Sequence, residues 1–348
     1  MPIPPIDETK RTLFGERLLQ KAILPQSLGE LGELAIKLAL IKEGPLGRPI
    51  HLLFGADHGV VAEGVTHSPQ EITWQQCRSF ALGGGACSLF ARLNGVEQRI
   101  IDVGIAHQFA PEDRVIDMKV GWGSANLLKE PAMTKEECEQ AMDVGRLLVG
   151  QASDEGFDLV IFGEMGVGNS TSASAIAAAM LAVDPHLVTG RGSGLSEKEL
   201  DHKVAVVQKA LQTHPSRDPL EILRCLGGFE VAAIVGGIME GVRRGLPILI
   251  DGIVVTAAAL IAHAMEPRIV DFLICAHRSA STGHALMVEH LGCGRALLDL
   301  GMYLGEGTGA LAAWPLVRLA SNILTELESF DEAQVYDSTT LLRTRGLV

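Results

Sequence analysis

The length, composition and charge of this chain exclude several classes of protein. Its 348 residues are 47% hydrophobic and 20% charged, which excludes a disordered or collagen-like chain and suffices for one large α/β domain with a smaller appendage, or for two modest domains. The formal net charge is -13 and the Lys and Arg residues are scattered, so we expect neither nucleic acid nor an anionic membrane as a partner.

Targeting and membrane signals are weak. The first residues, MPIPPIDETKRTLFGERLLQ, lack a basic region followed by an apolar one, so we expect no signal peptide and a cytoplasmic protein. Residues 246–265 approach the length of a membrane span, but Asp251 lies inside the run, so we interpret the segment as a buried strand followed by a helix. No CxxC pair is present, and we expect reduced, mostly buried thiols at Cys77, Cys87, Cys138, Cys225, Cys275 and Cys293.

Helical patterns occupy both ends of the chain. Within residues 1–48, apolar residues recur at spacings of three and four after Ser27, the expected N-cap. A similar periodicity returns at 316–330, before a polar tail. We therefore expect residues 1–48 and 316–348 to form a small helical domain beside a large domain of residues 49–315.

The large domain contains short apolar runs, each ending in a glycine-rich or polar turn. Such runs, followed by a loop and a helical pattern, predict an α/β fold with a doubly wound parallel sheet of five or six strand units. Ligands of these sheets bind beyond the carboxyl ends of the strands, where the polar turns fall. The runs are IHLLFGADHG, QRIIDVGI, DLVIFGEMGVGNS, LPILIDGIV and RIVDFLICAHRSAS.

Two of the turns are candidate phosphate sites. In FGEMGVGNSTSASAIAAAM, residues 162–180, the backbone N–H groups of the glycine turn can face an anion, and we expect Ser170 and Thr171 at the helix N-cap. In TGRGSGLSEKELDHK, residues 189–203, further amides precede a helix with Ser196 as N-cap, and Lys203 can add a positive charge. A tight strand-to-helix turn and a flexible surface loop are the respective alternatives.

Two further turns admit several interpretations. After the first apolar run, Asp57 and His58 suggest a metal, but no His pair at helical spacing supports one. We favour a loop that closes over an aromatic ligand, with Pro69 stiffening it and Gln75 able to hydrogen-bond. In ICAHRSASTGH, residues 274–284, a Ser-His hydrolase is conceivable, but the chain has no GxSxG motif.

One carboxylate stands in unusual surroundings. Glu306 lies between two glycines in YLGEGTGALAAWP, residues 303–315, where apolar neighbours would resist its ionisation. A general base and a loop acid that caps the following helix are both open interpretations of this residue.

Six segments in chain order resemble the nicotinate-nucleotide:dimethylbenzimidazole phosphoribosyltransferases of cobalamin assembly. The resemblance runs from about residue 17 to 330, and the segments are ADHGVVAEGV, GEMGVGNSTSASA, LGGFEVAAIVGGIMEG, LIDGIVVTAAAL, HRSASTGHALMVEHLG and LGEGTGALAAWPLVRLA. The resemblance implies a homodimer with a Rossmann-like, three-layer parallel sheet and a helical domain built from both chain ends. It implies transfer of phosphoribose from nicotinate mononucleotide to dimethylbenzimidazole, without a cofactor or metal, with Glu306 as the base.

The resemblance also assigns binding residues. Glu164, Gly166 and the following turn correspond to the ribose and phosphate side, Lys203 to a phosphate contact, and Ser279 to a polar residue near the nucleotide. With the glycine loops, we expect nucleotide or phosphate contacts at Glu164, Gly166, Gly168, Asn169, Ser170, Thr171, Gly190, Gly192, Lys203 and Ser279. We expect contacts to the acceptor base at His67, Ser68, Pro69, Gln75 and Leu304.

Three questions stay open. The chain departs from the family pattern at THSPQEITWQQ, residues 66–76, so the acceptor can be a benzimidazole, a purine or a phenol. A transferase that uses phosphoribosyl pyrophosphate is an alternative, although that chemistry needs two adjacent acids and Mg²⁺, whereas Asp251 stands alone before Gly252. A nucleotide sensor without catalytic activity is the second alternative.

Overall fold

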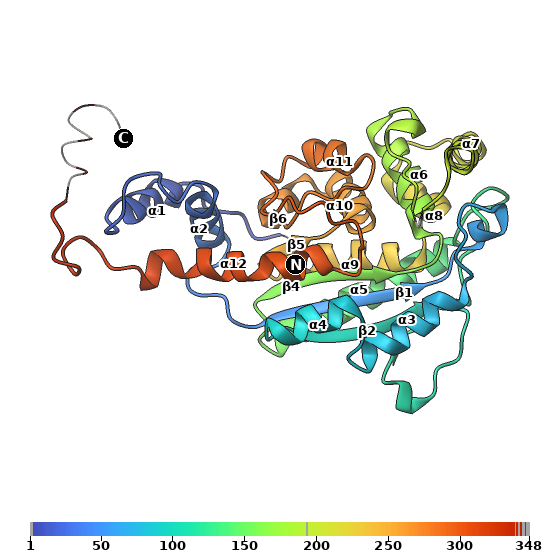
Figure 1. Ribbon diagram of the computed structural model, residues 1–348, viewed down its shortest axis with the longest axis horizontal. Coiled ribbons are helices and arrows are strands. Elements are labelled where there is room, and N and C mark those ends of the chain that lie inside the picture. The colour runs from blue at the N-terminus through green and yellow to red at the C-terminus, as the bar shows by residue number, and fades with distance from the viewer. Residues whose placement is uncertain (1–2, 193, 338, 340–341, 343–344, 346–348) are drawn as a thin grey trace.

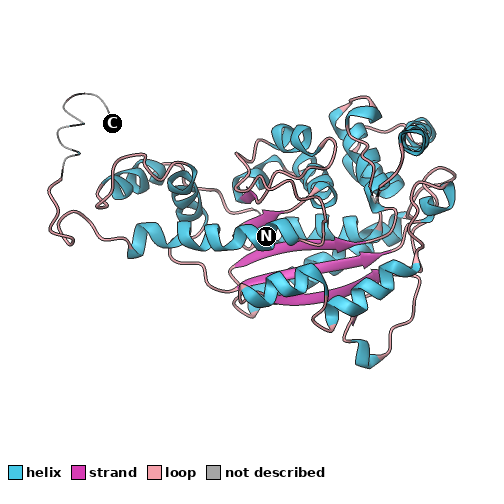
Figure 2. Cartoon of the chain, in the orientation of Figure 1, coloured by secondary structure: helices cyan, strands magenta, loops and turns pink. Residues whose placement is uncertain are grey.

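The chain folds around one six-stranded, entirely parallel sheet in the order β3-β2-β1-β4-β5-β6 (Figure 1, Figure 2). The computed structural model describes residues 3–337 apart from residue 193, together with residues 339, 342 and 345. The strands are β1 (Pro49–Ala56), β2 (Glu97–Gly104), β3 (Ile116–Asp117), β4 (Leu159–Met165), β5 (Ile248–Ile250) and β6 (Leu273–Cys275). The strand order reverses between β1 and β4, which makes their carboxyl ends the switch point of the sheet.

Helices cover both faces of the sheet. Leu52 and Phe54 of β1 face one layer and Leu53 faces the other, as the alternation of a strand requires. Helices α9 and α10 contact the first face, with α5 packed on α9, while α3, α4 and α12 contact the second, so the predicted three-layer α/β fold is confirmed. The helices are α1 (Lys10–Leu19), α2 (Glu30–Ile41), α3 (Glu71–Ala81), α4 (Gly85–Leu93), α5 (Lys135–Asp154), α6 (Asn169–Leu181), α7 (Glu197–Thr213), α8 (Pro219–Leu226), α9 (Phe229–Arg243), α10 (Ile253–Met265), α11 (His284–Leu291) and α12 (Thr308–Glu326).

Helices from the two ends of the chain lie together. Helix α2 packs on α12, and α1 contacts both of them at one end of the molecule (Figure 1). The backbone N–H of Ala22 donates to the carbonyl of Glu328 at 3.0 Å, which ties the two ends further. The boundary expected between residues 315 and 316 falls inside α12, and the division into two domains stays a prediction.

Some local predictions were right and others wrong. The segment 246–265 forms β5 and α10, and no helix in the described part of the chain could cross a membrane. All six cysteines are free and buried. Ser27 is not a cap: the N-cap of α2 is Gly29, because the polar residues before it form a turn in which Gly29 N–H donates to the carbonyl of Gln26 at 3.0 Å.

Candidate active site

Three of the buried acids at the carboxyl edge of the sheet surround the turn before α12. Glu164 is the second-last residue of β4, Asp251 follows β5, and Glu306 precedes α12; their exposed fractions are 8%, 1% and 8%. A buried carboxylate without a cation is costly, so each acid has to be explained by a partner or by a ligand.

Asp251 has a structural partner. Its Oδ1 accepts a hydrogen bond from the backbone N–H of Ala310 at 3.0 Å, in the first turn of α12. An acid at a helix N-terminus satisfies an otherwise unpaired N–H and interacts favourably with the helix dipole. Asp251 therefore caps α12, which leaves Glu306 free of the capping role that its sequence position suggested.

The Glu306 turn has an unusual backbone. Gly305, Glu306 and Gly307 have φ angles of 81°, 60° and 73°, all in the left-handed region that favours glycine. A Cβ on Gly305 would lie 2.5 Å from Oε1 of Glu164, and one on Gly307 would lie 2.5 Å from Nε2 of His51. The absence of a Cβ at the two glycines therefore lets the side chains of Glu164 and His51 pack directly against the turn.

The Glu306 carboxylate itself is poorly solvated. Burial raises the pKa of Glu306 to about 7, and the nearby charge of Asp251 adds to this effect, while hydrogen bonds from the thiol and backbone N–H of Cys87 oppose it. Within the described part of the chain, Oε2 of Glu306 has no hydrogen-bond partner. A carboxylate with a pKa near neutrality and a free oxygen has the properties of a general base.

Glu164 links this turn to the glycine loop after β4. Burial raises the pKa of Glu164 to about 8, together with the charges of Glu230, Asp251 and Glu306. Its Oε2 accepts a hydrogen bond from the side-chain amide of Asn169, the first residue of α6. The predicted base and the predicted phosphate turn are therefore joined through one buried acid.

The expected phosphate residues Ser170, Gly192 and Lys203 come together. Nζ of Lys203 donates to Oγ of Ser170 at 2.9 Å, and a Cβ on Gly192 would lie 3.5 Å from the same Nζ. Lys203 is 1% exposed, and burial lowers its pKa to about 8. No carboxylate in the described residues pairs with it, so this cation is available for an anionic ligand.

The glycine loop differs in detail from the prediction. The N-cap of α6 is Gly168, with φ 96°, so Ser170 and Thr171 lie in the first turn instead of at the cap. Gly168 takes the cap because the chain turns sharply there, and a Cβ would lie 2.8 Å from the Val61 side chain. A Cβ on Gly166 would lie 2.4 Å from the carbonyl oxygen of Ala56, so β1 and the loop after β4 meet closely at the switch point. Ser196 caps α7 as predicted.

Gly190 and Ser279 belong to a second group. A Cβ on Gly190 would lie 3.3 Å from Oγ1 of Thr282, in the loop after β6. Oγ of Ser279 lies 3.2 Å from Oγ of Ser281, whereas His284 accepts a hydrogen bond from the backbone N–H of Ser279 and not from its hydroxyl. This arrangement does not activate Ser279 as a nucleophile, so it gives no support to the hydrolase interpretation.

The residues expected to contact the acceptor base are spread over the surface. His67 is paired with Glu199 of α7 at 3.1 Å, with its side chain 60% exposed, and Leu304 is 57% exposed. Gln75 is exposed on α3, the backbone N–H of Ser68 donates to Oγ1 of Thr66, and the carbonyl of Pro69 accepts from Ile72. The structure does not gather these five side chains into one enclosed pocket.

Several residues at the site were not predicted. Thr73, on the inner face of α3, accepts a hydrogen bond from the backbone N–H of Val167 in the loop after β4 at 3.1 Å. Cys87 lies in the first turn of α4 beside Glu306. The helical periodicity of Thr73, Cys77 and Phe80, which are all buried, is the signal that could have identified the inner face of α3.

Asp57 and His58 are engaged by the protein. Nε2 of His58 lies 2.6 Å from Oε1 of Glu230 in a fully buried pair, and Oδ2 of Asp57 accepts from the backbone N–H of Ala106 at 2.8 Å. Burial acts to lower the pKa of His58, but the charge and hydrogen bond of Glu230, together with the charge of Asp57, outweigh it and raise that pKa. Among the described residues, no group of three or more His, Cys, Asp or Glu side chains could hold a metal ion.

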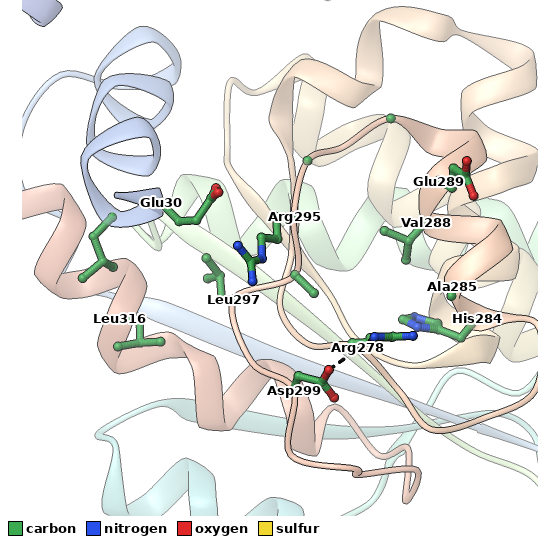
Figure 3. Close-up of a pocket in the computed structure, with 14 residues that line it drawn as sticks. Glu30, Arg278, His284, Ala285, Val288, Glu289, Arg295, Leu297, Asp299 and Leu316 are labelled. Carbon is green, nitrogen blue, oxygen red and sulfur yellow. Dashed lines mark hydrogen bonds and ion pairs between the residues drawn. The ribbon is translucent and has the colours of Figure 1, made fainter. Parts of the chain in front are cut away.

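A separate cleft of about 860 Å³ opens between α2, α11 and α12 (Figure 3). Arg278, Arg295 and Leu316 contribute to its lining, and Arg278 pairs with Asp299 across 3.5 Å. None of the residues predicted for the site lines this cleft. Its walls come largely from α11 and the loop that follows α11, so it is distinct from the space around Glu306.

The fold and these side chains define a class of protein. The strand order is that of doubly wound α/β proteins, in which a ligand binds across the switch point of the sheet. A family model described as phosphoribosyltransferase matches residues 3–335, and the chain belongs to this family.

Individual relatives agree along almost the whole chain. It is 42% identical over 340 residues to the nicotinate-nucleotide-dimethylbenzimidazole phosphoribosyltransferase of Azotobacter vinelandii, covering 96% of each chain. It is 38% identical over 341 residues to the protein of the same name from Citrifermentans bemidjiense, covering 97% of each. The crystal structure of CobT from Thermus thermophilus is similar with a TM-score of 0.90 and 42% identity, covering 94% of this chain and 99% of the other.

Proposed function

We propose that this protein transfers 5-phosphoribose from nicotinate mononucleotide to 5,6-dimethylbenzimidazole or a related base. The products are alpha-ribazole 5'-phosphate and nicotinate, and the reaction serves assembly of the nucleotide loop of cobalamin. The family membership and the shared name of the relatives support this activity.

The chemistry breaks one bond to the anomeric carbon and forms another. The bond to the pyridinium nitrogen breaks, and its electron pair leaves with nicotinate. A ring nitrogen of the acceptor attacks the opposite face, which inverts the anomeric carbon, and the acceptor then carries a positive charge until its N–H proton is removed. A departing pyridinium becomes neutral at its ring nitrogen, so the leaving group needs no proton, and the step that needs help is the removal of the acceptor proton.

Glu306 is the residue that we propose for this step. The observation that carries the proposal is its free, buried Oε2 on a carboxyl whose pKa is raised to about 7. A base of this pKa is partly ionised at pH 7 and still takes a proton well. Burial also keeps water from competing with the acceptor for the carboxylate.

Lys203, Ser170 and the amides of Gly192 and α6 are the proposed phosphate site. An ammonium that is 1% exposed and has no carboxylate partner in the described residues is best explained by a dianionic ligand. Glu164, between this site and Glu306, is then placed to meet the ribose hydroxyl groups, in the protonated form that a pKa of about 8 favours at pH 7.

The experiment combines the purified protein with nicotinate mononucleotide and, separately, dimethylbenzimidazole, adenine or cresol, and follows the release of nicotinate. We expect release with at least the benzimidazole, and the same rate when EDTA is present, because the proposed reaction uses no metal. No release with any acceptor would contradict the proposed function. Formation of the acceptor ribotide from phosphoribosyl pyrophosphate, with release of pyrophosphate and a requirement for Mg²⁺, would favour the alternative transferase.

The two alternatives have less support. Asp251, the single acid after β5, is hydrogen-bonded to α12 and lies 3.3 Å from Nε2 of His277, so it is not free to hold ribose hydroxyls in the manner of an enzyme that uses phosphoribosyl pyrophosphate. A nucleotide sensor without catalysis would need no general base, so that alternative does not explain the unpaired Oε2 of Glu306.

We also propose a cytoplasmic homodimer. Sedimentation or light scattering of the purified protein tests the assembly: twice the 37.0 kDa chain mass is expected, and a monomer at micromolar concentration would contradict it.

A further inference from the structure

A chain of polar side chains, buried at Ser88 and His51 and half-buried at Gln98, runs beneath the Glu306 turn. Oγ of Ser88 lies 2.7 Å from Oε1 of Gln98, and Nε2 of Gln98 lies 3.0 Å from Nδ1 of His51. Ser88 is on α4, Gln98 on β2 and His51 on β1, so three separate elements contribute. His51 is 0% exposed in the middle of an apolar strand, where a polar side chain is costly unless its groups are paired.

The far end of this chain faces Glu306. A Cβ on Gly163 would lie 2.3 Å from Nε2 of His51 and 2.8 Å from the backbone oxygen of Glu306, so these two atoms border the same small space. In the described part of the chain Nε2 has no hydrogen-bond partner, so its N–H is free to approach the Glu306 carbonyl across this space. The glycine at 163 keeps the space open for this approach.

The protonation of His51 follows from its neighbours. Burial lowers the pKa of His51 to about 4, so the ring is neutral at pH 7 and carries one N–H. The Ser88 hydroxyl is 2.7 Å from the amide oxygen of Gln98 and 3.0 Å from the carbonyl of Phe80, and its hydrogen goes to the shorter contact. The Gln98 amide then donates to Nδ1, which leaves the single ring proton on Nε2, pointing at the Glu306 carbonyl.

The other side of Glu306 is held by the residue next to Ser88. Cys87 lies beside the Glu306 carboxylate, and its thiol and backbone N–H act to lower the pKa of Glu306. Consecutive residues of α4 therefore act on the two polar ends of Glu306: Cys87 on the carboxylate directly, and Ser88 on the carbonyl through Gln98 and His51.

We propose that Ser88, Gln98 and His51 form a positioning relay, which fixes the left-handed Glu306 turn so that the carboxylate reaches the acceptor proton. This inference rests on the proposed function. The relay touches neither substrate; it acts through the backbone of Glu306, whose φ of 60° is not otherwise favoured for a glutamate. Small displacements of a reacting group are expensive, since about 1 Å can cost a hundredfold in rate.

The central test removes the N–H donor of His51 and keeps an aromatic ring at this position. For His51→Phe we expect kcat to fall roughly 10- to 100-fold, with the KM for nicotinate mononucleotide little changed because the Lys203 end is intact. The midpoint of the rise of kcat with pH, here called the limb, should also move away from about pH 7, because the Glu306 carboxylate leaves its present contacts. Cys87 of α4, Asp251 after β5 and Glu164 of β4 face that carboxylate, and this variant changes none of them.

Two variants separate positioning from packing. His51→Gln places an amide N–H near the position of Nε2 and should recover most of kcat and the original limb. His214→Phe is the matched control, because Nε2 of His214 likewise lies 2.9 Å from a backbone carbonyl, that of Leu127, at the distal end of α7; its kinetics should equal wild type. A loss of packing alone would lower the fraction of active protein and leave the limb in place.

The outcomes are distinct. Wild-type kcat and an unmoved limb in His51→Phe would overturn the relay, as would equal impairment of His51→Gln and His51→Phe. If His51→Phe does not fold, Gln98→Met and Ser88→Ala decide, and unchanged kinetics in both would overturn it. Failure of the proposed function is seen separately, as an absence of nicotinate release by the wild type.

A spectroscopic measurement tests the relay without activity. In protein labelled with ¹⁵N-histidine, His51 is assigned by its loss in His51→Gln. We expect a neutral ring protonated at Nε2, with no titration between pH 5.5 and 9, given a pKa of about 4. A proton on Nδ1, or a titration near pH 6.5, would contradict the relay.

Discussion

The two ends of the candidate site carry opposite unpaired charges. At the phosphate end, Lys203 is a buried cation without a carboxylate partner in the described residues; at the acid end, Glu306 is a buried carboxyl with a free oxygen. Both are costly in the empty protein. A ligand with a phosphate at one end and a positive charge at the other would relieve both. A nucleotide that exchanges its pyridinium ring for a transiently cationic acceptor ring has this distribution.

The two ends also differ in construction. The phosphate end is made from two loops, one of them with exposed glycines such as Gly192. The acid end is fixed by a left-handed turn, the α4 N-terminus and a buried polar chain. Under the proposed function the loop end binds the nucleotide and the acid end performs the chemistry, so we expect variants at the two ends to affect different kinetic constants.

The largest expected effect is on kcat at the acid end. Glu306→Gln keeps the size of the side chain and removes the base, so we expect kcat to fall by roughly two to four orders of magnitude while the nucleotide still binds. Steady-state kinetics of nicotinate release measures the first, and calorimetric titration with nicotinate mononucleotide the second. A variant that lost binding and rate equally would remove the distinction between the two ends.

At the phosphate end the effect should fall on binding. Lys203→Met removes a charge-assisted hydrogen bond, and we expect the KM for nicotinate mononucleotide to rise about 10- to 100-fold with a smaller change in kcat. Lys198→Met, on the exposed surface of the same helix, is the control and should behave as wild type. Equal behaviour of the two lysine variants would show that Lys203 does not meet the phosphate.

Much of the phosphate end could be predicted from the sequence, because its determinants are local. The glycines and hydroxyls of each loop follow one another closely along the chain, and the structure confirms that Ser196 caps α7. The contact of 2.9 Å between Ser170 and Lys203 was not predicted. The partners of Glu306 were not predictable in this way. Cys87, His51 and Gln98 come from three elements whose proximity depends on the strand order.

The residues of the expected base contacts teach a related lesson. Gln75 was selected because its amide can hydrogen-bond, but the 3.6-residue period of α3 directs Thr73, Cys77 and Phe80 inward and leaves Gln75 exposed. We predicted the N-cap of α6 at Ser170, but the structure has it at Gly168, where a Cβ would clash with the Val61 side chain. The sequence alone contains no information on such contacts between distant residues.

The pH dependence should also separate the ends. Lys203 loses its charge as pH rises through its pKa of about 8, so the KM of the free enzyme for the nucleotide should increase above that pH. The Glu306 base instead gains activity as pH rises through about 7. Initial rates at saturating and limiting nucleotide, measured across pH 6 to 9.5, resolve the two limbs; a KM independent of pH would contradict the role of Lys203.

The smallest expected effect is on stability. The pKa of Glu306 is raised from 4.5 to about 7 in the folded protein, so the folded state holds the proton more tightly and its stability falls as pH rises through this range. Glu306→Gln avoids that loss, and we expect it to be more stable than wild type by roughly 1–3 kcal/mol at pH 8.5 and nearly equal at pH 4.5. Urea unfolding at both pH values measures the difference, and a less stable variant at pH 8.5 would contradict the burial argument.

The central claim is that ionised Glu306 removes the acceptor proton, and the pH dependence of kcat for wild type and Glu306→Gln tests it most directly. Nicotinate release with saturating dimethylbenzimidazole should rise in the wild type to a plateau with a midpoint near pH 7. In Glu306→Gln the rate should be low and the limb should disappear. A variant that kept both the wild-type rate and the same limb would show that another group is the base.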